Sequence, residues 1–326
     1  MITVEHLTKC YGDFVAVDDL SFEIGEGHVY GFLGPNGAGK STTMNIMTGC
    51  LSATAGHVRI DGHDIFDEPN QAKALIGYLP EQPPLYMNET PAEYLRFVGE
   101  AKGLRGEELT RQIEAVMEQT KIQDMRNRCI NALSKGYKQR VGIAQALLGN
   151  PKVIILDEPT VGLDPIQIIE IRDLIRQLGQ THTVILSSHI LSEVQTMCEK
   201  ILIIAKGKLI AFDAPENLER RLLSPSEITL TTEADEPTAR EILTGVDGIT
   251  ETQFTAGPDS LLTIHLRTDT HDIYRLSKAL FFAFAQKNTA LLEMALKKAN
   301  LEDIFLELTE GSGETKSSSE SKGAKA

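Results

Sequence analysis

The sequence predicts an α/β fold built on a mostly parallel sheet, with a second, smaller domain after it. Short, unbroken apolar runs are typical of strands that are buried on both faces of a sheet. Helical patterns alternate with these runs, which is the element order of an α/β domain. A glycine-rich motif between the first run and a helix supports the same fold class. The apolar runs are residues 29–33, 153–156, 183–186 and 201–204.

Length and charge narrow the class of protein. The chain has 326 residues, of which 46 are acidic and 32 basic, and its formal net charge is −14. At roughly 150 residues per domain, this length favours two domains. A hydrophobic fraction of 41% and a charged fraction of 24% are typical of a globular protein. The acidic excess argues against a general nucleic-acid binder, which would carry a basic face, although it does not exclude a local basic patch.

The sequence contains no candidate membrane span or metal cluster. Its longest apolar run, residues 279–285, lies in a helical pattern and is far shorter than the roughly 20 residues that cross a bilayer. The first residues alternate like a strand and lack the layout of a signal peptide. The four cysteines form no CxxC pair, which suits a reducing cytosol and offers no zinc site. If the protein works at a membrane, we expect another chain to span it.

The glycine-rich motif predicts a phosphate site. Residues 34–41 (GPNGAGKS) match GxxxxGK[ST], follow the expected strand 29–33 and precede an expected helix, 42–48. Glycines allow backbone N–H groups to point at phosphates, and the helix N-terminus adds partial positive charge. We expect Lys40 to reach the β- and γ-phosphates and Ser41 to ligate Mg²⁺. The predicted nucleotide-binding residues here are Gly34, Pro35, Asn36, Gly37, Ala38, Gly39, Lys40, Ser41 and Thr42.

A pair of acids ends the apolar run 153–156. In open α/β sheets, ligands bind beyond the carboxyl ends of the strands, so Asp157 and Glu158 should face the phosphate site. We expect Asp157 to hold Mg²⁺ and Glu158 to act as the general base on the attacking water.

Five further motifs, in order, give the chain its family resemblance. They are Cys10-Tyr11-Gly12, Tyr78-Leu79-Pro80-Glu81-Gln82, the stretch 133–140 (LSKGYKQR), Gly162-Leu163-Asp164-Pro165 and Ser187-Ser188-His189. Over residues 2 to about 222 the chain resembles the nucleotide-binding subunit of an ABC transporter. The motifs correspond to that family's adenine-stacking aromatic, Q-loop, LSGGQ signature, D-loop and switch histidine. The resemblance implies a P-loop ABC-type ATPase fold, with a β-subdomain and a helical subdomain inserted at about 85–140.

The resemblance also implies roles for single residues, with ATP and Mg²⁺ as cofactors. Tyr11 would stack on adenine, Gln82 would be catalytic and a metal ligand, and His189 would contact the γ-phosphate. Two subunits would sandwich two nucleotides. The residues expected to serve the nucleotide of the second subunit are Ser134, Gly136 and Asp164. Ser134 and Asp164 are also natural helix N-caps, with Pro165 at the first helical position.

The signature motif departs from the family pattern. Lys135, Gly136 and Tyr137 stand where the family has Gly-Gly-Gln. Lys135 could add positive charge near the nucleotide or project into solvent, and the sequence leaves both open. Some export-type members carry a similar LSKG variant, and the remaining catalytic residues are present. We therefore expect a hydrolytically competent subunit.

Residues 227–309 predict a small accessory domain. The order β-α-β-β-α-β is ferredoxin-like, with the expected elements at 227–232, 239–243, 250–256, 260–266, 272–287 and 290–297. The last of these could equally be a helix, because its apolar residues fit both periodicities. A closing helix is expected from Asn300. Residues 310–326 are low-complexity and are expected to be a disordered tail.

The C-terminal extension resembles that of ATPase subunits of drug and lipid exporters. It implies the ABC-2 export branch, a separate multi-span permease that docks at residues 85–103, and a second copy of the chain or a related ATPase subunit. We expect a cytoplasmic protein, peripheral on the inner face of the cell membrane and held there through its partner. One alternative is a soluble ABC-type ATPase of DNA repair or translation, whose usual coiled coils, tandem cassettes and zinc insertions are missing. The other is a P-loop kinase or GTPase, but the sequence has no NKxD motif.

Overall fold

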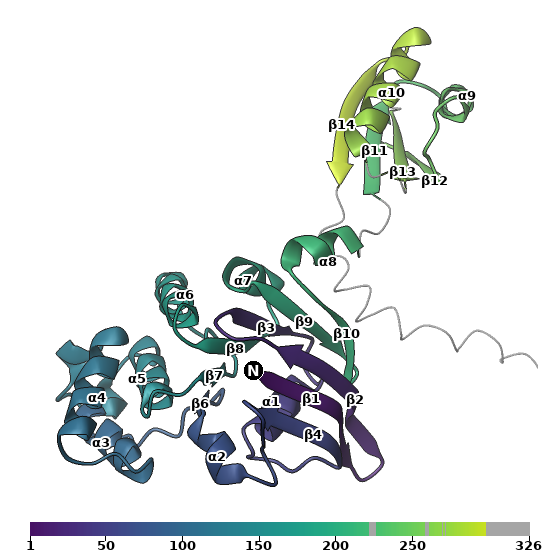
Figure 1. Cartoon of the computed structure of the whole chain (residues 1–326). Coiled ribbons are helices and arrows are strands. Elements are labelled where there is room, and N and C mark those ends of the chain that lie inside the picture. The colour runs from purple at the N-terminus through teal and green to yellow at the C-terminus, as the bar shows by residue number, and fades with distance from the viewer. Residues whose placement is uncertain (222–225, 258–260, 269, 271, 298–326) are drawn as a thin grey trace, which may run out of the picture. The chain divides into compact units, whose positions relative to one another are not determined.

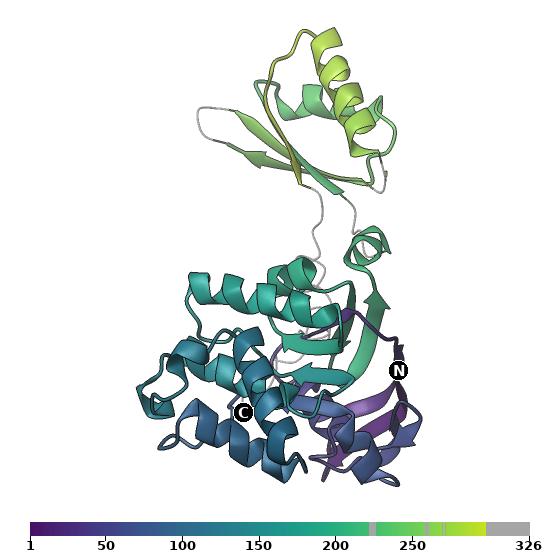
Figure 2. The same ribbon diagram turned by 60° about the vertical axis from the view of Figure 1, so that its left-hand side comes forward.

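The chain forms two compact units. The computed structural model describes residues 1–221, 226–257, 261–268, 270 and 272–297. Contacts divide the chain into Met1–Pro215 and Glu216–Ala326, and Figures 1 and 2 show both units. The sequence-based boundary after residue 222 lies slightly later than this division. The expected closing helix from Asn300 and the tail 310–326 lie outside the described residues.

A six-stranded sheet forms the centre of the first unit. Its order is β10-β9-β3-β8-β7-β6, and neighbours are parallel except for the antiparallel edge strand β10. Every residue of β3, β7 and β8 is buried, as expected for a sheet that is covered on both faces. The strands are β3 (Val29–Leu33), β6 (Ile76–Leu79), β7 (Val153–Leu156), β8 (Thr183–Ser188), β9 (Lys200–Ala205) and β10 (Lys208–Asp213). The predicted mostly parallel α/β sheet is confirmed.

Different layers cover the two faces of this sheet. Alternate strand residues such as Tyr30 and Ile155 share one hydrophobic core with helix α1 (Lys40–Met47) and a second, antiparallel sheet. That sheet has the order β2-β1-β4-β5, from β1 (Ile2–Tyr11), β2 (Phe14–Ile24), β4 (Ala55–Ile60) and β5 (His63–Asp64). The opposite face packs on α5 (Lys135–Leu147), α6 (Pro165–Gly179) and α7 (Leu191–Met197). Helix α2 (Pro69–Ala74) precedes β6.

Between β6 and β7 the chain is helical, as predicted. Helices α3 (Pro91–Ala101) and α4 (Gly106–Gln119) pack on each other and on α5, with the short 3₁₀ turns η1 (Gln123–Met125) and η2 (Ile130–Ala132) between α4 and α5. Thr90 and Glu93 form a capping box at the start of α3: each side chain accepts a hydrogen bond from the other's backbone N–H. The insertion leads into α5, whose first turns belong to the signature motif and which packs on β6 and β7.

The second unit has the predicted ferredoxin-like order. After α8 (Pro215–Arg221) follow β11 (Ser226–Thr232), α9 (Glu236–Thr244), β12 (Glu251–Ala256), β13 (Leu262–Thr268), α10 (Ile273–Gln286) and β14 (Leu291–Lys297). The sheet order is β12-β13-β11-β14, with every pair antiparallel. The ambiguous last element is a strand, because Met294 pairs opposite Leu230 and both belong to the unit's core.

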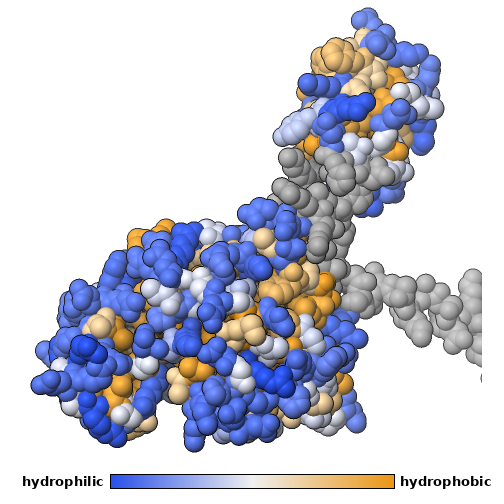
Figure 3. Space-filling view, viewed as in Figure 1, coloured by the Kyte–Doolittle hydropathy of each residue, from blue (hydrophilic) through white to orange (hydrophobic). Residues whose placement is uncertain are grey.

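No helix in the described part of the chain is long and apolar enough to span a membrane. The face in Figure 3 is mostly hydrophilic, with smaller hydrophobic patches between the hydrophilic residues.

Candidate functional site

The phosphate-binding motif forms the loop from β3 to α1, the context that the sequence predicted. Gly39 caps α1 with a φ of 104°, in the left-handed region that favours glycine. A Cβ on Gly39 would lie 2.6 Å from the carbonyl oxygen of Ala16, and one on Gly34 would lie 2.4 Å from that of Ile204. Both glycines are therefore required by close packing of the loop backbone against the strands around it.

Lys40 is folded back over this loop. Its Nζ donates to the carbonyl oxygens of Gly34 at 2.7 Å and Pro35 at 3.3 Å, and it lies 3.8 Å from Glu158 Oε1. Burial lowers the pKa of the Lys40 ammonium below its usual value, while the charges of Glu158, Asp157 and Glu81 act in the opposite direction. A buried cation whose hydrogen-bond partners are mostly neutral carbonyls is suited to an anionic ligand.

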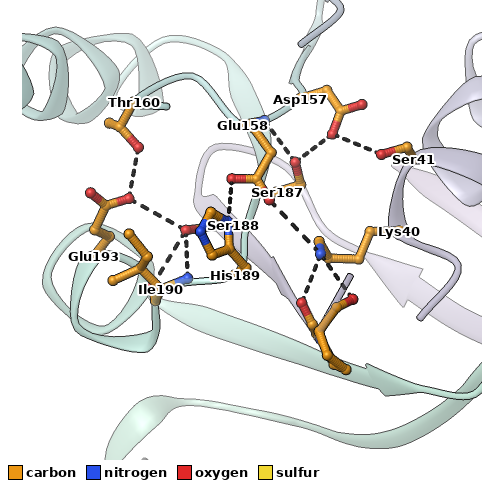
Figure 4. A network of polar contacts seen from close by, with 12 residues as sticks. Lys40, Ser41, Asp157, Glu158, Thr160, Ser187, Ser188, His189, Ile190 and Glu193 are labelled. Atoms are coloured by element: carbon orange, nitrogen blue, oxygen red, sulfur yellow. Dashed lines mark hydrogen bonds and ion pairs between the residues drawn. The ribbon is translucent and has the colours of Figure 1, made fainter. Parts of the chain in front are cut away.

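The two predicted acids end β7 and are both buried. Asp157 Oδ1 accepts hydrogen bonds from Ser187 Oγ at 2.6 Å and Ser41 Oγ at 3.4 Å. The backbone N–H of Glu158 donates to Ser187 Oγ at 2.8 Å. Figure 4 shows that Ser187 lies between the two acids. Its hydroxyl contacts both and holds them at the carboxyl end of the sheet.

His189 follows β8 and faces Glu158. Its Nδ1 lies 3.0 Å from Glu158 Oε2, while its side chain remains 43% exposed. Strand β8 pairs with both β3 and β7, so the carboxyl ends of three neighbouring strands bring together the phosphate loop, the acids and the histidine. This is the edge at which ligands bind in open α/β sheets.

A cavity of about 340 Å³ opens at this edge. Tyr11 and Phe14, opposite each other at the β1–β2 turn, form an exposed aromatic wall. The cavity is lined by Tyr11, Phe14, Ala16, Asn36, Gly37, Gly39, Lys40, Ser41, Thr42, Glu81, Glu158, Val161 and His189. Of the other predicted loop residues, Gly34 and Ala38 are buried and Pro35 is half-buried.

Outside the phosphate loop, five predicted residues are not among those that line this cavity: Gln82, Ser134, Gly136, Asp157 and Asp164. Gln82 is exposed in the loop after β6, and its neighbour Glu81 is the residue that lines the cavity. Ser134 and Asp164 are N-caps as predicted: their side chains accept from the backbone N–H groups of the third residue of α5 and of α6. Gly136 is buried against α6: a Cβ there would lie 2.7 Å from the Gln167 side chain.

Lys135 lies against the loop before α6. A Cβ on Gly162 would lie 2.1 Å from Lys135 Nζ, so the amine covers that glycine within the same chain. Tyr137, the other departure in this motif, donates a hydrogen bond to Asp124 Oδ2 at 3.2 Å. Both unusual side chains therefore have contacts within this subunit.

Sequence reasoning missed several residues at the site. The sequence predicted no role for Ser187 beyond its place in the Ser187-Ser188-His189 motif, although it contacts both acids. Glu81 lines the cavity one residue before the Gln82 that was predicted, and Phe14 stands opposite Tyr11. The hairpin partner of Tyr11 was the one detectable signal, because a turn at residues 12–13 places residue 14 opposite it.

Comparison with known proteins agrees with this geometry. The family model described as ABC transporter matches residues 17–161. An uncharacterised ABC transporter ATP-binding protein of Bacillus subtilis (strain 168), YhcH, is 35% identical over 320 residues, which cover 97% of each chain. The linearmycin resistance ATP-binding protein LnrL of the same strain is 32% identical over 310 residues, covering 95% of this chain and 98% of LnrL.

A solved structure supports the same assignment. The ATP-binding cassette MJ0796, solved as a dimer in a post-hydrolysis state with ADP and Pi, matches with a TM-score of 0.60 and 27% identity. The match covers 66% of this chain and 98% of that cassette. The chain therefore belongs to the ATP-binding proteins of ABC transporters and is an ATPase of that family.

Proposed function

We propose that the cavity at the carboxyl ends of β3, β7 and β8 is the ATP site, and that hydrolysis there powers export through a separate membrane permease. The observation that carries this proposal is the convergence of Lys40, Ser41, Glu158 and His189 on one cavity. Tyr11 and Phe14 offer an aromatic wall for the adenine ring. The loop glycines and the N-terminus of α1 offer N–H groups to the phosphates.

The donor set beside the phosphate loop fits Mg²⁺. Mg²⁺ prefers oxygen ligands and is commonly held by one or two carboxylates together with substrate phosphates. Ser41 Oγ and Asp157 Oδ1 are hydrogen-bonded at 3.4 Å, so both oxygens face the same point. We assign the metal to Ser41 and Asp157, with Gln82 as a further ligand. The ion, when bound, neutralises phosphate charge.

Glu158 and His189 would perform the chemistry. The buried Glu158 carboxylate takes the proton of the attacking water as a general base. His189, hydrogen-bonded to Glu158 and exposed to the cavity, orients this carboxylate and contacts the γ-phosphate. Lys40 leaves its two loop carbonyls for the β- and γ-phosphates, whose charge its ammonium stabilises. Gln82 completes the proposed catalytic set from the neighbouring loop.

A second copy of the chain would complete each site. Ser134, Gly136 and Asp164 lie away from this subunit's own cavity lining but at the N-termini of two helices. A helix N-terminus favours an anion, so these residues suit the γ-phosphate of ATP that is bound to the partner subunit. We propose a homodimer of the cassette, residues 1–222, with residues 227–309 as its accessory domain.

A multi-span permease would dock beside the Gln82 loop. Tyr86, Met87 and Phe97 are 51%, 45% and 50% exposed within the expected docking segment 85–103. The rings of Tyr86 and Phe97 pack at a tilt with their centroids 5.1 Å apart, which forms an apolar surface for a partner. Export through an ABC-2-type permease at the inner face of the cell membrane is supported by near full-length similarity to a resistance protein.

The test is the ATPase activity of a Lys40→Ala variant of the full chain. Removing the ammonium should reduce hydrolysis by about 10²-fold or more, because a preorganised charge on the transferred phosphate is lost. Binding of a fluorescent ATP analogue should weaken as well. Thermal unfolding of the variant serves as the folding control. Wild-type turnover in a folded Lys40→Ala chain would refute the site.

A further inference from the structure

We propose that Glu193 is a positioning residue. It holds the loop after Glu158 and the turn at His189 in the relative positions that hydrolysis requires. The inference rests on the proposed catalytic roles of those two residues. Glu193 stands in the first turn of α7 and is 3% exposed. A buried carboxylate is unfavourable unless it is paired and hydrogen-bonded, so its partners indicate why it is there.

One oxygen of Glu193 joins two loops of the site. Its Oε2 accepts from Thr160 Oγ1 at 2.7 Å, and Ser188 Oγ lies 3.3 Å from the same oxygen. Thr160 comes two residues after Glu158, and Ser188 comes directly before His189. Figure 4 shows Glu193 on the far side of these loops from Lys40.

The contact with Ser188 fixes the backbone on both sides of His189. Ser188 Oγ accepts from the backbone N–H of Ile190 at 3.0 Å, which closes a tight turn with His189 at its centre. The hydroxyl proton of Ser188 can point to Glu193 Oε2 or to the Ile190 carbonyl oxygen at 3.4 Å. Glu193 therefore stabilises the turn that presents His189 to Glu158.

A third element, α6, meets the other oxygen. Arg172 Nη2 lies 3.6 Å from Glu193 Oε1, and Arg172 Nε is buried without a hydrogen-bond partner among the described residues. An unpaired buried N–H costs free energy. The partly buried guanidinium therefore has the Glu193 carboxylate as its ion-pair partner. The carboxylate thus ties α6 and α7 to the ends of β7 and β8.

The position of Glu193 predicts which kinetic constant it controls. Among the described residues, Glu193 contacts Thr160, Arg172 and Ser188, and the described cavity lining does not include it. The residues of the phosphate loop that would bind ATP are therefore unaffected by its loss. The distance between the side chains of Glu158 and His189, by contrast, depends on the Glu193 carboxylate. Its loss should lower kcat and leave KM for ATP unchanged.

The experiment measures kcat, KM for ATP and thermal unfolding of the full chain with Glu193→Ala, Glu193→Gln and Glu158→Gln. Misplacing a catalytic group by about 1 Å can cost about 10²-fold, so Glu193→Ala should lower kcat by that order with KM within about twofold of wild type. Glu193→Gln keeps hydrogen-bonding atoms at both loops and should recover part of the rate. Asp64→Asn is the matched control, because Asp64 is another buried carboxylate, in the antiparallel sheet of the same unit. It should leave kcat at the wild-type value.

The outcomes separate this inference from the proposed function. If Glu158→Gln is inactive while Glu193→Ala keeps wild-type kcat, the positioning role is refuted and the catalytic assignment stands. If Glu158→Gln itself keeps wild-type activity, the proposed catalytic site fails first. A Glu193→Ala chain whose kcat falls no more than its folded fraction, or whose KM rises as kcat falls, would also refute the positioning role.

Discussion

The backbone of Glu158 adopts a φ of 49°, in the left-handed region that non-glycine residues rarely occupy. Its N–H donates to Ser187 Oγ and its carboxylate meets His189 and Lys40. Such conformations cost free energy and persist where the surroundings fix them. The left-handed backbone of Glu158 turns the chain after β7, so that Asp157 contacts Ser41 while Glu158 contacts Lys40 and His189. Two adjacent acids thereby gain separate environments.

Asp64 provides a pH-dependent test of stability. Burial alone would raise the pKa of Asp64, but hydrogen bonds from the Phe66 and Asp67 N–H groups and the His57 ring outweigh it and hold the pKa below its usual value. A lowered folded-state pKa contributes stability above the unfolded value of about 3.9 and loses it as pH falls through the lower, folded value. Asp64→Asn should therefore lose about 1 kcal/mol at neutral pH.

Thermal unfolding of wild type and Asp64→Asn over a pH series measures this difference. The gap between the two melting temperatures should be full at about pH 6 and should shrink below about pH 4, where the wild-type carboxyl takes up its proton. A gap that is the same at both ends of the series would show that the carboxylate charge is not the cause.

Residues whose function depends on local sequence were predictable, and residues whose function depends on long-range packing were not. Lys40 and Ser41 belong to a contiguous motif, and Glu158 directly follows a recognisable buried strand. Glu193 gains its role from Thr160, 33 positions earlier in the chain, and from Arg172. Nothing in the sequence around Glu193 indicates that its side chain turns inward, so the carboxylate was not a candidate.

Helix α5 approaches strand β6 closely at a glycine, Gly77. A Cβ on Gly77 would lie 2.2 Å from the carbonyl oxygen of Ala146, which is backbone and cannot move aside as a side chain can. Gly77→Ala should therefore destabilise the first unit by about 1–3 kcal/mol, the usual cost of overpacking a close contact. Thermal unfolding of the full chain measures this loss. Gly245→Ala is the control, because its Cβ would meet nothing nearer than 3.6 Å and should cost far less.

Element identity was predictable wherever the apolar period was distinct. Residues 29–33 and 153–156 are strands with the bounds that the sequence indicated. The segment 290–297 was ambiguous because Leu292, Met294 and Leu296 alternate while neighbouring apolar residues also fit a helix. Pairing with β11 decides for a strand, since it places Met294 and Leu296 on the second unit's core and leaves Leu292 exposed. The sequence of one segment does not indicate which strand it will pair with, so this pairing could not be predicted.

The order of the strands in the central sheet brings the parts of the site together. The phosphate loop and the Asp157–Glu158 pair are far apart in sequence, yet β8 alone separates β3 from β7. The sequence predicted that these residues share a sheet edge, but the strand order that brings them together is a property of the sheet. The N-caps of α5 and α6 are not part of the described cavity lining, so in the proposed homodimer one chain would carry an ATP site together with residues for its partner's site.

This division of the site predicts how a Glu158→Gln chain behaves with MgATP. The amide keeps the shape of the side chain but cannot take the proton from water, so bound ATP should persist. Because Lys40 and Ser41 remain, ATP stays at the interface and should hold two chains together as a dimer. Sedimentation with and without MgATP measures this state. The double variant Lys40→Ala/Glu158→Gln should stay monomeric, because its phosphate-binding loop has lost the ammonium that contacts the phosphates. A Glu158→Gln monomer that still binds MgATP would contradict the shared site.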